Sequence, residues 1–220
     1  MAIRAVFFDI DGTLVDSNRY HVEAWSRAFA ATGHPIDRDR IAGQIGKGTD
    51  NLVPTLLPGT SDEVAERMGD LHGAFFKNDY MPRVRAFPGA RDLLVRVRDS
   101  GRTVVLASSA SKAELDHYLT VLDARDLVDV KTTIDDVENS KPAPDIFAVA
   151  RDKAGVNASE VVVVGDAPYD MDAARQLGTV RIGVRSGRFG DDTLVEAGAQ
   201  HLYDDVADLL AHFDRSPLVA

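Results

Sequence analysis

The stretch FFDIDGTLVDS, residues 7–17, decides the fold because it sets Asp9 and Asp11 two positions apart, after an apolar run and before Gly12. The preceding residues 4–8 are rich in β-formers, which predicts a buried strand with both carboxylates at its carboxyl end. Open α/β sheets bind their ligands outside that end of their strands. The sequence therefore predicts the functional site directly after the first strand.

The spacing of the two acids also indicates a kind of chemistry. In an extended chain residues i and i+2 point to one side, so we expect Asp9 and Asp11 to lie close together. Two adjacent carboxylates repel unless a cation or a proton neutralises one of them. The pair suits a hard divalent cation with oxygen ligands, with one carboxylate free to attack and the other able to carry a proton. The alternative is a structural Asp-Gly turn capped by Asp9.

Later segments also place polar residues after apolar runs. Residues 103–107 are followed by Ser108 and Ser109, which predicts a strand, a hydroxyl-rich turn and then a helix. A hydroxyl there can hold a phosphoryl oxygen, although a serine before a helix is more commonly a cap. Lys141 lies in a loop before a helix that begins at Pro144.

The last such segment is acidic. The apolar run 160–165 ends in Gly165 and Asp166, and Asp170 follows one helical turn later. We expect Asp166 to reach a metal ion bound beside the first strand. The other acidic pair, Asp135 and Asp136, lacks the strand-Gly-Thr context and is expected in a solvated turn.

Four segments resemble, in order and spacing, the motifs of the haloacid dehalogenase superfamily of phosphotransferases: Asp9-x-Asp11-Gly-Thr13, Ser108, Lys141 and Gly165-Asp166-x-x-x-Asp170. The resemblance spans nearly the whole chain, and the motifs are highly specific as a set. It implies a doubly wound, Rossmann-like parallel-sheet core with an all-helical cap inserted after the first strand.

The resemblance also implies a role for each motif residue. Asp9 would be the nucleophile that becomes an aspartyl-phosphate, and Asp11 the acid that protonates the leaving oxygen and then activates water. Ser108 and Lys141 would hold the transferring phosphoryl group. The resemblance implies magnesium as cofactor, and its ligands would be Asp9, the main-chain carbonyl of Asp11, Asp166 and Asp170, the last in contact with the ion or just behind its ligands.

Further substrate contacts are expected from the turn after Asp9 and from the cap. The expected substrate-binding residues are Gly12, Thr13, His21, Gly46, Lys47, Gly48 and Ser109. The glycines permit close approach and Lys47 is a cation, although an ordinary helix-helix turn with an exposed lysine fits the same pattern. His21 is equally compatible with a surface position at a helix start.

The chain resembles the branch that contains phosphoglycolate phosphatases and β-phosphoglucomutases. Superfamily members that cleave halides or phosphonates lack the second aspartate, so Asp11 favours phosphate esters. Where sugar phosphomutases carry an arginine in the cap, an ungapped placement gives Thr49 here, which favours hydrolysis over mutase chemistry. The expected enzyme is a magnesium-dependent phosphatase of a small phosphorylated metabolite, a sugar phosphate or phosphoglycolate.

Two non-enzymatic alternatives remain. Response-regulator receiver domains also combine a doubly wound sheet, an acidic magnesium site, a phosphorylated aspartate, a hydroxyl residue and a lysine. They have no helical insert after the first strand, which argues against a signalling switch. A binding protein that kept the fold but lost the chemistry would lack catalytic residues, whereas every expected one is present. Both alternatives predict no turnover.

Alternating strands and helices predict a core of residues 1–16 and 86–220, and the interval 17–85, which carries only helical patterns, predicts the cap. Cap helices are expected at 21–32, 37–45, 50–57 and 61–79, with Val22, Trp25 and Phe29 in the cap interior. Core helices are expected at 90–99, 111–121, 144–154, 168–177 and 206–213, and strands at 102–107, 127–132, 160–165, 179–184 and 200–203. Residues 215–220 are expected to be loose.

The composition restricts the partners. The formal net charge of −10 over 220 residues argues against nucleic acid or an anionic membrane as partner. The chain has no cysteine, which is compatible with a reducing compartment, and neither a signal sequence nor a membrane-spanning run is apparent. We expect a cytoplasmic monomer or homodimer.

Overall fold

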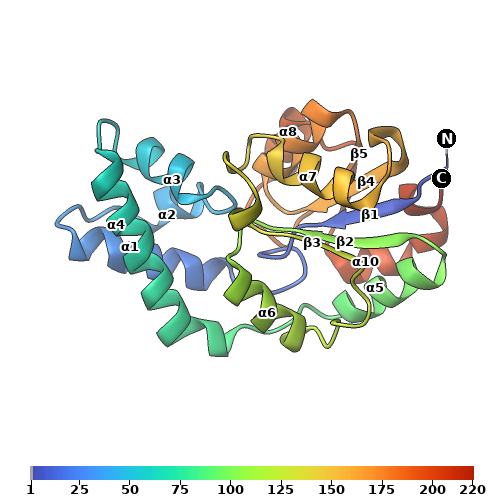
Figure 1. Cartoon of the computed structure of the whole chain (residues 1–220), viewed down its shortest axis with the longest axis horizontal. Coiled ribbons are helices and arrows are strands. Elements are labelled where there is room, and N and C mark those ends of the chain that lie inside the picture. Colours follow the sequence, from blue (N-terminus) through green and yellow to red (C-terminus); the bar gives the residue numbers. More distant parts are fainter. Residues whose placement is uncertain (1) are drawn as a thin grey trace.

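The computed structural model describes residues 2–220 and has the predicted α/β core with a helical insert after the first strand (Figure 1). Six parallel strands form one sheet in the order β3-β2-β1-β4-β5-β6. The strands are β1 (Ala5–Phe8), β2 (Thr103–Ala107), β3 (Val130–Thr132), β4 (Val161–Gly165), β5 (Val180–Val184) and β6 (His201–Tyr203). The chain runs from β1 outward through β2 to β3 and then crosses to β4 on the other side of β1. The switch point where such sheets bind ligands therefore lies at β1.

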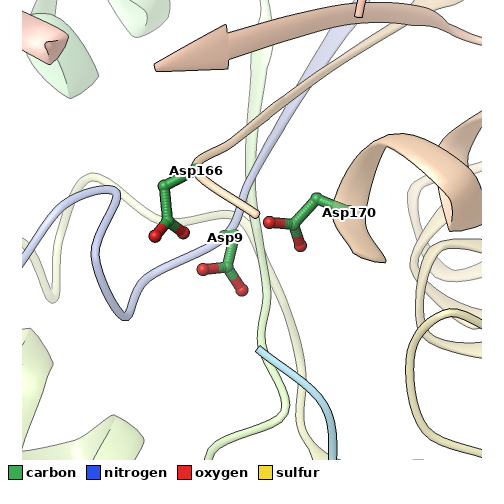
Figure 2. A group of neighbouring side chains, drawn as sticks. All are labelled: Asp9, Asp166 and Asp170. Atoms are coloured by element: carbon green, nitrogen blue, oxygen red, sulfur yellow. The ribbon is translucent and has the colours of Figure 1, made fainter. Parts of the chain in front are cut away.

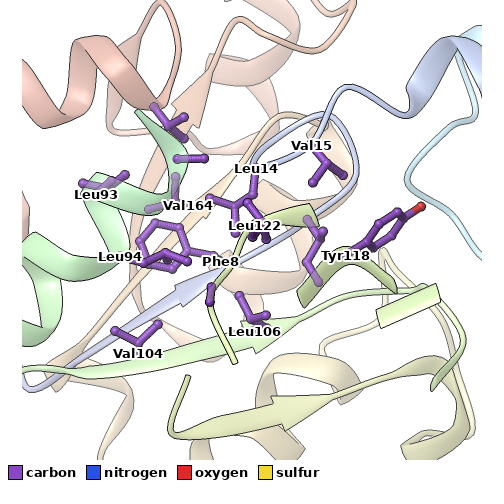
Figure 3. Packing of buried hydrophobic residues seen from close by; sticks show 14 of the residues in the cluster. Phe8, Leu14, Val15, Leu93, Leu94, Val104, Leu106, Tyr118, Leu122 and Val164 are labelled. Atoms are coloured by element: carbon purple, nitrogen blue, oxygen red, sulfur yellow. The ribbon is translucent and has the colours of Figure 1, made fainter. Parts of the chain in front are cut away.

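Helices cover both faces of the sheet, which explains why β1 is apolar at every position. They are α5 (Ala90–Asp99), α6 (Lys112–Val121), α7 (Asp145–Ala154), α8 (Pro168–Leu177), α9 (Asp191–Ala197) and α10 (Val206–Ala211). Val6 and Phe8 face the cluster that includes Leu94 of α5 and Tyr118 of α6 (Figure 3). Phe7 points to the opposite face, against α7 and α8. A strand buried on both faces holds its carboxyl end rigidly in place.

The helical insert lies beside the carboxyl ends of the strands, at the far side of the molecule from both termini (Figure 1). It contains α1 (Asn18–Ala31), α2 (Arg38–Ala42), α3 (Thr49–Leu56) and α4 (Asp62–Phe75), followed by a π-helical turn at Phe76–Tyr80 and a 3₁₀ turn at Met81–Arg83. Val22, Trp25 and Phe29 are buried in its own apolar cluster, as expected. The insert therefore has a core separate from that of the sheet.

Two antiparallel connections join the insert to the sheet domain. The Asp16 amide donates to the Arg85 carbonyl, and the Phe87 amide donates to the Leu14 carbonyl, each at 2.9 Å. Only these entering and leaving segments link the two parts covalently.

The elements differ from the expectation in several places, among them α2, which ends at Ala42 although a helix was expected to residue 45. Helix α9 was not predicted, and β3 covers only the last part of the expected strand. The prediction of a loose terminus at 215–220 was wrong, because Leu218 is fully buried and the Ile3 amide donates to the Ala220 carbonyl at 2.9 Å. The buried Leu218 side chain and this backbone hydrogen bond together dock the end of the chain. Within residues 2–220, no helix combines the length and apolar character that a membrane span requires.

Candidate active site

Three buried carboxylates gather at the carboxyl end of the central strands (Figure 2). Asp9 follows β1, Asp166 follows β4, and Asp170 lies in the first turn of α8. Because β1 and β4 are neighbours in the sheet, the residues that follow them meet at one edge. One oxygen of each carboxylate lies within 4.8 Å of the other two. Three oxygen donors of this kind suit a hard divalent cation.

Lys141 supplies the positive charge of this cluster. Its Nζ lies 2.5 Å from Oδ1 of Asp9 and 2.7 Å from Oδ1 of Asp170, and it also donates to the Ala107 carbonyl at 3.2 Å. Burial alone would lower the pKa of Lys141, but the charges of Asp170 and Asp9 outweigh burial and raise it. Lys141 is therefore a fixed cation, although its side chain is only 1% exposed.

One lysine does not neutralise three acids. Burial, together with the negative charges of Asp170 and Asp166, raises the pKa of Asp9 well above its usual value, although Lys141 opposes the shift. Burial and the charge of Asp170 likewise raise the pKa of Asp166 to about 7. Both shifts express the cost of holding excess negative charge away from water. A divalent cation would remove that cost, so Asp9, Asp166 and Asp170 fit the expected magnesium site.

The turn after Asp9 supports Asp166. Gly12 has a φ of 79°, and a Cβ atom on it would lie 2.2 Å from Oδ2 of Asp166, so only glycine fits there. Thr13 Oγ1 donates to Asp166 Oδ1 at 3.2 Å and Asn18 Nδ2 donates to Oδ2 at 2.9 Å. Gly12 and Thr13, expected to bind substrate, thus contact the acid cluster instead of lining the cavity described below.

Asp11 lies outside the cluster. Its Oδ1 accepts hydrogen bonds from Ser17 Oγ at 2.5 Å and Tyr118 Oη at 2.7 Å, and lies 3.0 Å from Nε2 of His21. Burial would raise the pKa of Asp11, but the charge of His21 and these three hydrogen bonds outweigh it and lower the pKa. Asp11 is therefore held as a carboxylate. That the main-chain carbonyl of Asp11 binds magnesium stays a prediction.

His72 of α4 extends this network and was not anticipated. Its Nε2 lies 3.2 Å from Nδ1 of His21, and its ring stacks on Trp25 with the centroids 4.3 Å apart. The ring of His21 itself stacks on the ring of Phe76, with the centroids 3.9 Å apart. Burial and the charge of His21 hold the pKa of His72 well below its usual value. A neutral imidazole thus adjoins the histidine that contacts Asp11.

A cavity of about 510 Å³ opens between the insert and the sheet domain. From the sheet domain it is lined by four of the predicted residues: Asp9, Asp11, Ser108 and Ser109. From the insert it is lined by another four: His21, Gly46, Lys47 and Gly48. Like Gly12 and Thr13, the other predicted residues do not line the cavity: Lys141, Asp166 and Asp170.

The loop at 46–48 also contacts the sheet domain directly. Gly48 N donates to Ser140 Oγ at 3.0 Å, and Asn51 Nδ2 donates to the same oxygen at 2.9 Å. A Cβ atom at Gly48 would lie 2.6 Å from that of Ser140, so a glycine is required for this close approach. Lys47 Nζ donates to Gln44 Oε1 at 2.7 Å, which occupies part of its donor capacity. The insert is therefore closed against the loop that carries Lys141.

Several residues of the site were missed by the sequence interpretation: Ser17, Asn18, His72, Tyr118 and Ser140. Ser17 and Asn18 lie at the expected boundary between core and cap, but nothing in the sequence indicates that they contact Asp11 and Asp166. The other three carry no local pattern that distinguishes them from ordinary helix or loop residues.

The comparisons with known proteins agree with this geometry. The model of the haloacid dehalogenase-like hydrolases matches residues 3–178. A phosphorylated carbohydrates phosphatase of Thermotoga maritima is 30% identical over 205 residues, which cover 90% of this chain and 92% of that protein. A phosphoglycolate phosphatase of Cupriavidus necator is 30% identical over 213 residues, covering 94% and 91%.

The fold has a close solved counterpart. The crystal structure of a hydrolase from Pseudomonas syringae superposes with a TM-score of 0.90 at 33% identity, and the match covers 96% of this chain and 98% of that one. The family match spans all four motif segments and the insert. The chain therefore belongs to the haloacid dehalogenase-like hydrolases, and its helical insert follows the first strand.

Proposed function

We propose that this hydrolase is a magnesium-dependent phosphatase of small phosphorylated metabolites. The observation that carries the proposal is the position of Asp9, which lines the cavity on one side and joins the buried cluster of Asp166, Asp170 and Lys141 on the other. A nucleophile in this position contacts a substrate in the cavity, and the buried cluster sets the charge of its carboxylate.

In the first step, a carboxylate oxygen of Asp9 attacks phosphorus, and the bond between phosphorus and the leaving oxygen breaks. The leaving oxygen takes a proton from Asp11, whose side chain lines the same cavity. Since three donors hold Asp11 as a carboxylate here, it must be released from at least part of them to carry that proton. Ser108, which lines the cavity, would hold an oxygen that does not react, and Lys141 pairs with Asp9 from outside the cavity.

In the second step, water attacks the phosphorus of the aspartyl-phosphate. Asp11 takes the proton from water, the bond between phosphorus and Asp9 breaks, and phosphate leaves. The donors on Asp11 favour its carboxylate form and so support this step. A magnesium ion held by Asp9, Asp166 and Asp170 would supply the charge neutralisation that lets a carboxylate approach a phosphate dianion.

We propose a sugar phosphate or phosphoglycolate as substrate. The two relatives described above act on phosphorylated carbohydrates and on phosphoglycolate by name, and both classes fit a cavity of about 510 Å³. Thr49 lines the cavity where the resemblance places the mutase arginine, and within residues 2–220 no arginine lines it. That composition favours hydrolysis over transfer to a second hydroxyl.

The test is phosphate release from sugar phosphates, phosphoglycolate, nucleotides and an aryl phosphate, with magnesium and with a chelator. We expect magnesium-dependent release by the parent and none by Asp9→Asn. Asp11→Asn should form a phosphoenzyme poorly and lose it slowly. Isomerisation of an aldose 1-phosphate without net release would assign a mutase instead, and full activity of Asp9→Asn would rule out the mechanism.

A further inference from the structure

Gly73 has no structural reason to be a glycine. It lies in α4, and helical turns continue beyond it through Tyr80, so it occupies a helix interior. Glycine there destabilises a helix relative to alanine. Its φ is not in the left-handed region, and a Cβ atom built on it would meet nothing within 4 Å. Neither backbone conformation nor packing requires it.

Packing does require a glycine at Gly69, one turn earlier on the same helix. A Cβ atom on Gly69 would lie 2.9 Å from Cγ2 of Thr49, so the packing of α3 against α4 explains that glycine. Both glycines line the cavity that contains Asp9. The space beside Gly73 is therefore cavity space, left free at a cost in helix stability.

The cavity that Gly73 lines carries both apolar side chains, such as Trp25 and Met81, and polar ones. The same helix contributes Asp70 and His72, and Lys77 follows in the next turn, while Glu114 comes from the sheet domain. Carboxylates and an imidazole accept hydrogen bonds from hydroxyl groups, and the lysine donates to them. The polar side chains of the lining thus suit the hydroxyl groups of a substrate that extends beyond the reacting phosphate.

We propose that Gly73 is a specificity-determining residue, which reserves cavity volume for a sugar-sized, hydroxylated leaving group. The inference rests on the proposed phosphatase function and refines its substrate class. A side chain at this position would exclude a hexose moiety but leave room for the two-carbon acid of phosphoglycolate.

The experiment compares the parent with Gly73→Ala, Gly73→Leu and the matched control Ala74→Leu. Ala74 is the exposed neighbour on α4 and does not line the cavity. For each protein, kcat/KM is measured with a hexose phosphate and with phosphoglycolate, and Tm is measured without substrate. Gly73→Ala tests the position even where leucine impairs folding.

We expect Gly73→Ala to raise Tm by about 2–4 °C, because it removes the helix penalty without a clash. Gly73→Leu should lower kcat/KM for the hexose phosphate by about tenfold or more and leave phosphoglycolate within about twofold, since pocket discrimination by size has this magnitude. Ala74→Leu should leave kcat/KM unchanged for both substrates.

Two results would overturn the inference alone: equal loss with both substrates in the Gly73 variants, or a parent that hydrolyses phosphoglycolate but no hexose phosphate. A parent that releases phosphate from no ester would overturn the proposed function and this inference together. Retained phosphoglycolate turnover in Gly73→Leu separates the two cases, because it shows that the chemistry is intact.

Discussion

Nε2 of His72 lies 3.2 Å from Nδ1 of His21, so a residue of α4 contacts the histidine of α1 that faces the predicted acid-base residue. His21 Nε2 must carry a proton to donate to the Asp11 carboxylate. Its Nδ1 then either accepts from His72 or, when His21 is charged, donates to it. His72 therefore orients the ring that holds Asp11.

The position of His72 predicts a pH-dependent stability. In the folded protein the pKa of His72 is well below its usual value, whereas in the unfolded chain it is about 6.5. As pH falls below about 6.5, the unfolded state takes up a proton that the folded state does not, so stability falls, by up to about 1.4 kcal/mol per pH unit. We expect urea unfolding of His72→Gln to show a shallower decline between about pH 6.5 and 5. Identical slopes would contradict this assignment.

The raised pKa of Asp166 predicts that magnesium binding depends on pH. A carboxyl group with a pKa of about 7 is protonated below that pH and must release its proton to bind a cation. Magnesium affinity should therefore fall by up to about tenfold per pH unit below about 7 and level off above it. Calorimetry in two buffers of different ionisation enthalpy would count the released protons. Asp172→Asn, which changes a surface acid of α8, should behave like the parent, and a pH-independent affinity in the parent would refute the prediction.

The burial of Lys141 predicts a large loss of stability on its removal. Lys141→Met leaves Asp9 and Asp170 without their buried cation, which should cost about 3–5 kcal/mol in the absence of magnesium. Magnesium should recover more Tm in this variant than in the parent, because it neutralises the same carboxylates. In the control Lys153→Met, whose surface pair with Asp136 is solvated, the change should stay within about 0.5 kcal/mol. Equal effects of the two substitutions would show that the buried pair is unimportant.

The contact between Ser140 and the cap predicts a defect in turnover without a defect in folding. Ser140→Ala removes the acceptor of the Gly48 amide and of the Asn51 side chain. Losing these bonds should destabilise the closed form by about 1–1.5 kcal/mol. If turnover occurs in the closed form, kcat/KM should then fall by about tenfold. Steady-state kinetics should show that decrease with Tm nearly unchanged, whereas Asn139→Ala in the same loop should match the parent. Unchanged kinetics in Ser140→Ala would mean that this contact does not hold the cap closed.

The sequence alone predicted the fold class, the insert and the order of the motifs, because each depends on local patterns. A run of β-formers ending in Asp9 defines a strand and its functional end, and the helical periodicity of 17–85 marks the insert. Parallel pairing then brings together the residues after β1 and β4, so the meeting of Asp9 with Asp166 was also predictable.

Only the tertiary structure decided what surrounds Asp11 and how the insert meets the core. Tyr118, His21 and His72 come from three different helices, and no spacing along the chain indicates that their side chains converge. The same holds for the docking of Leu218, which a short terminal segment does not reveal. Local patterns fix backbone conformation, whereas contacts between distant side chains depend on how whole elements pack, which is a property of the assembled chain.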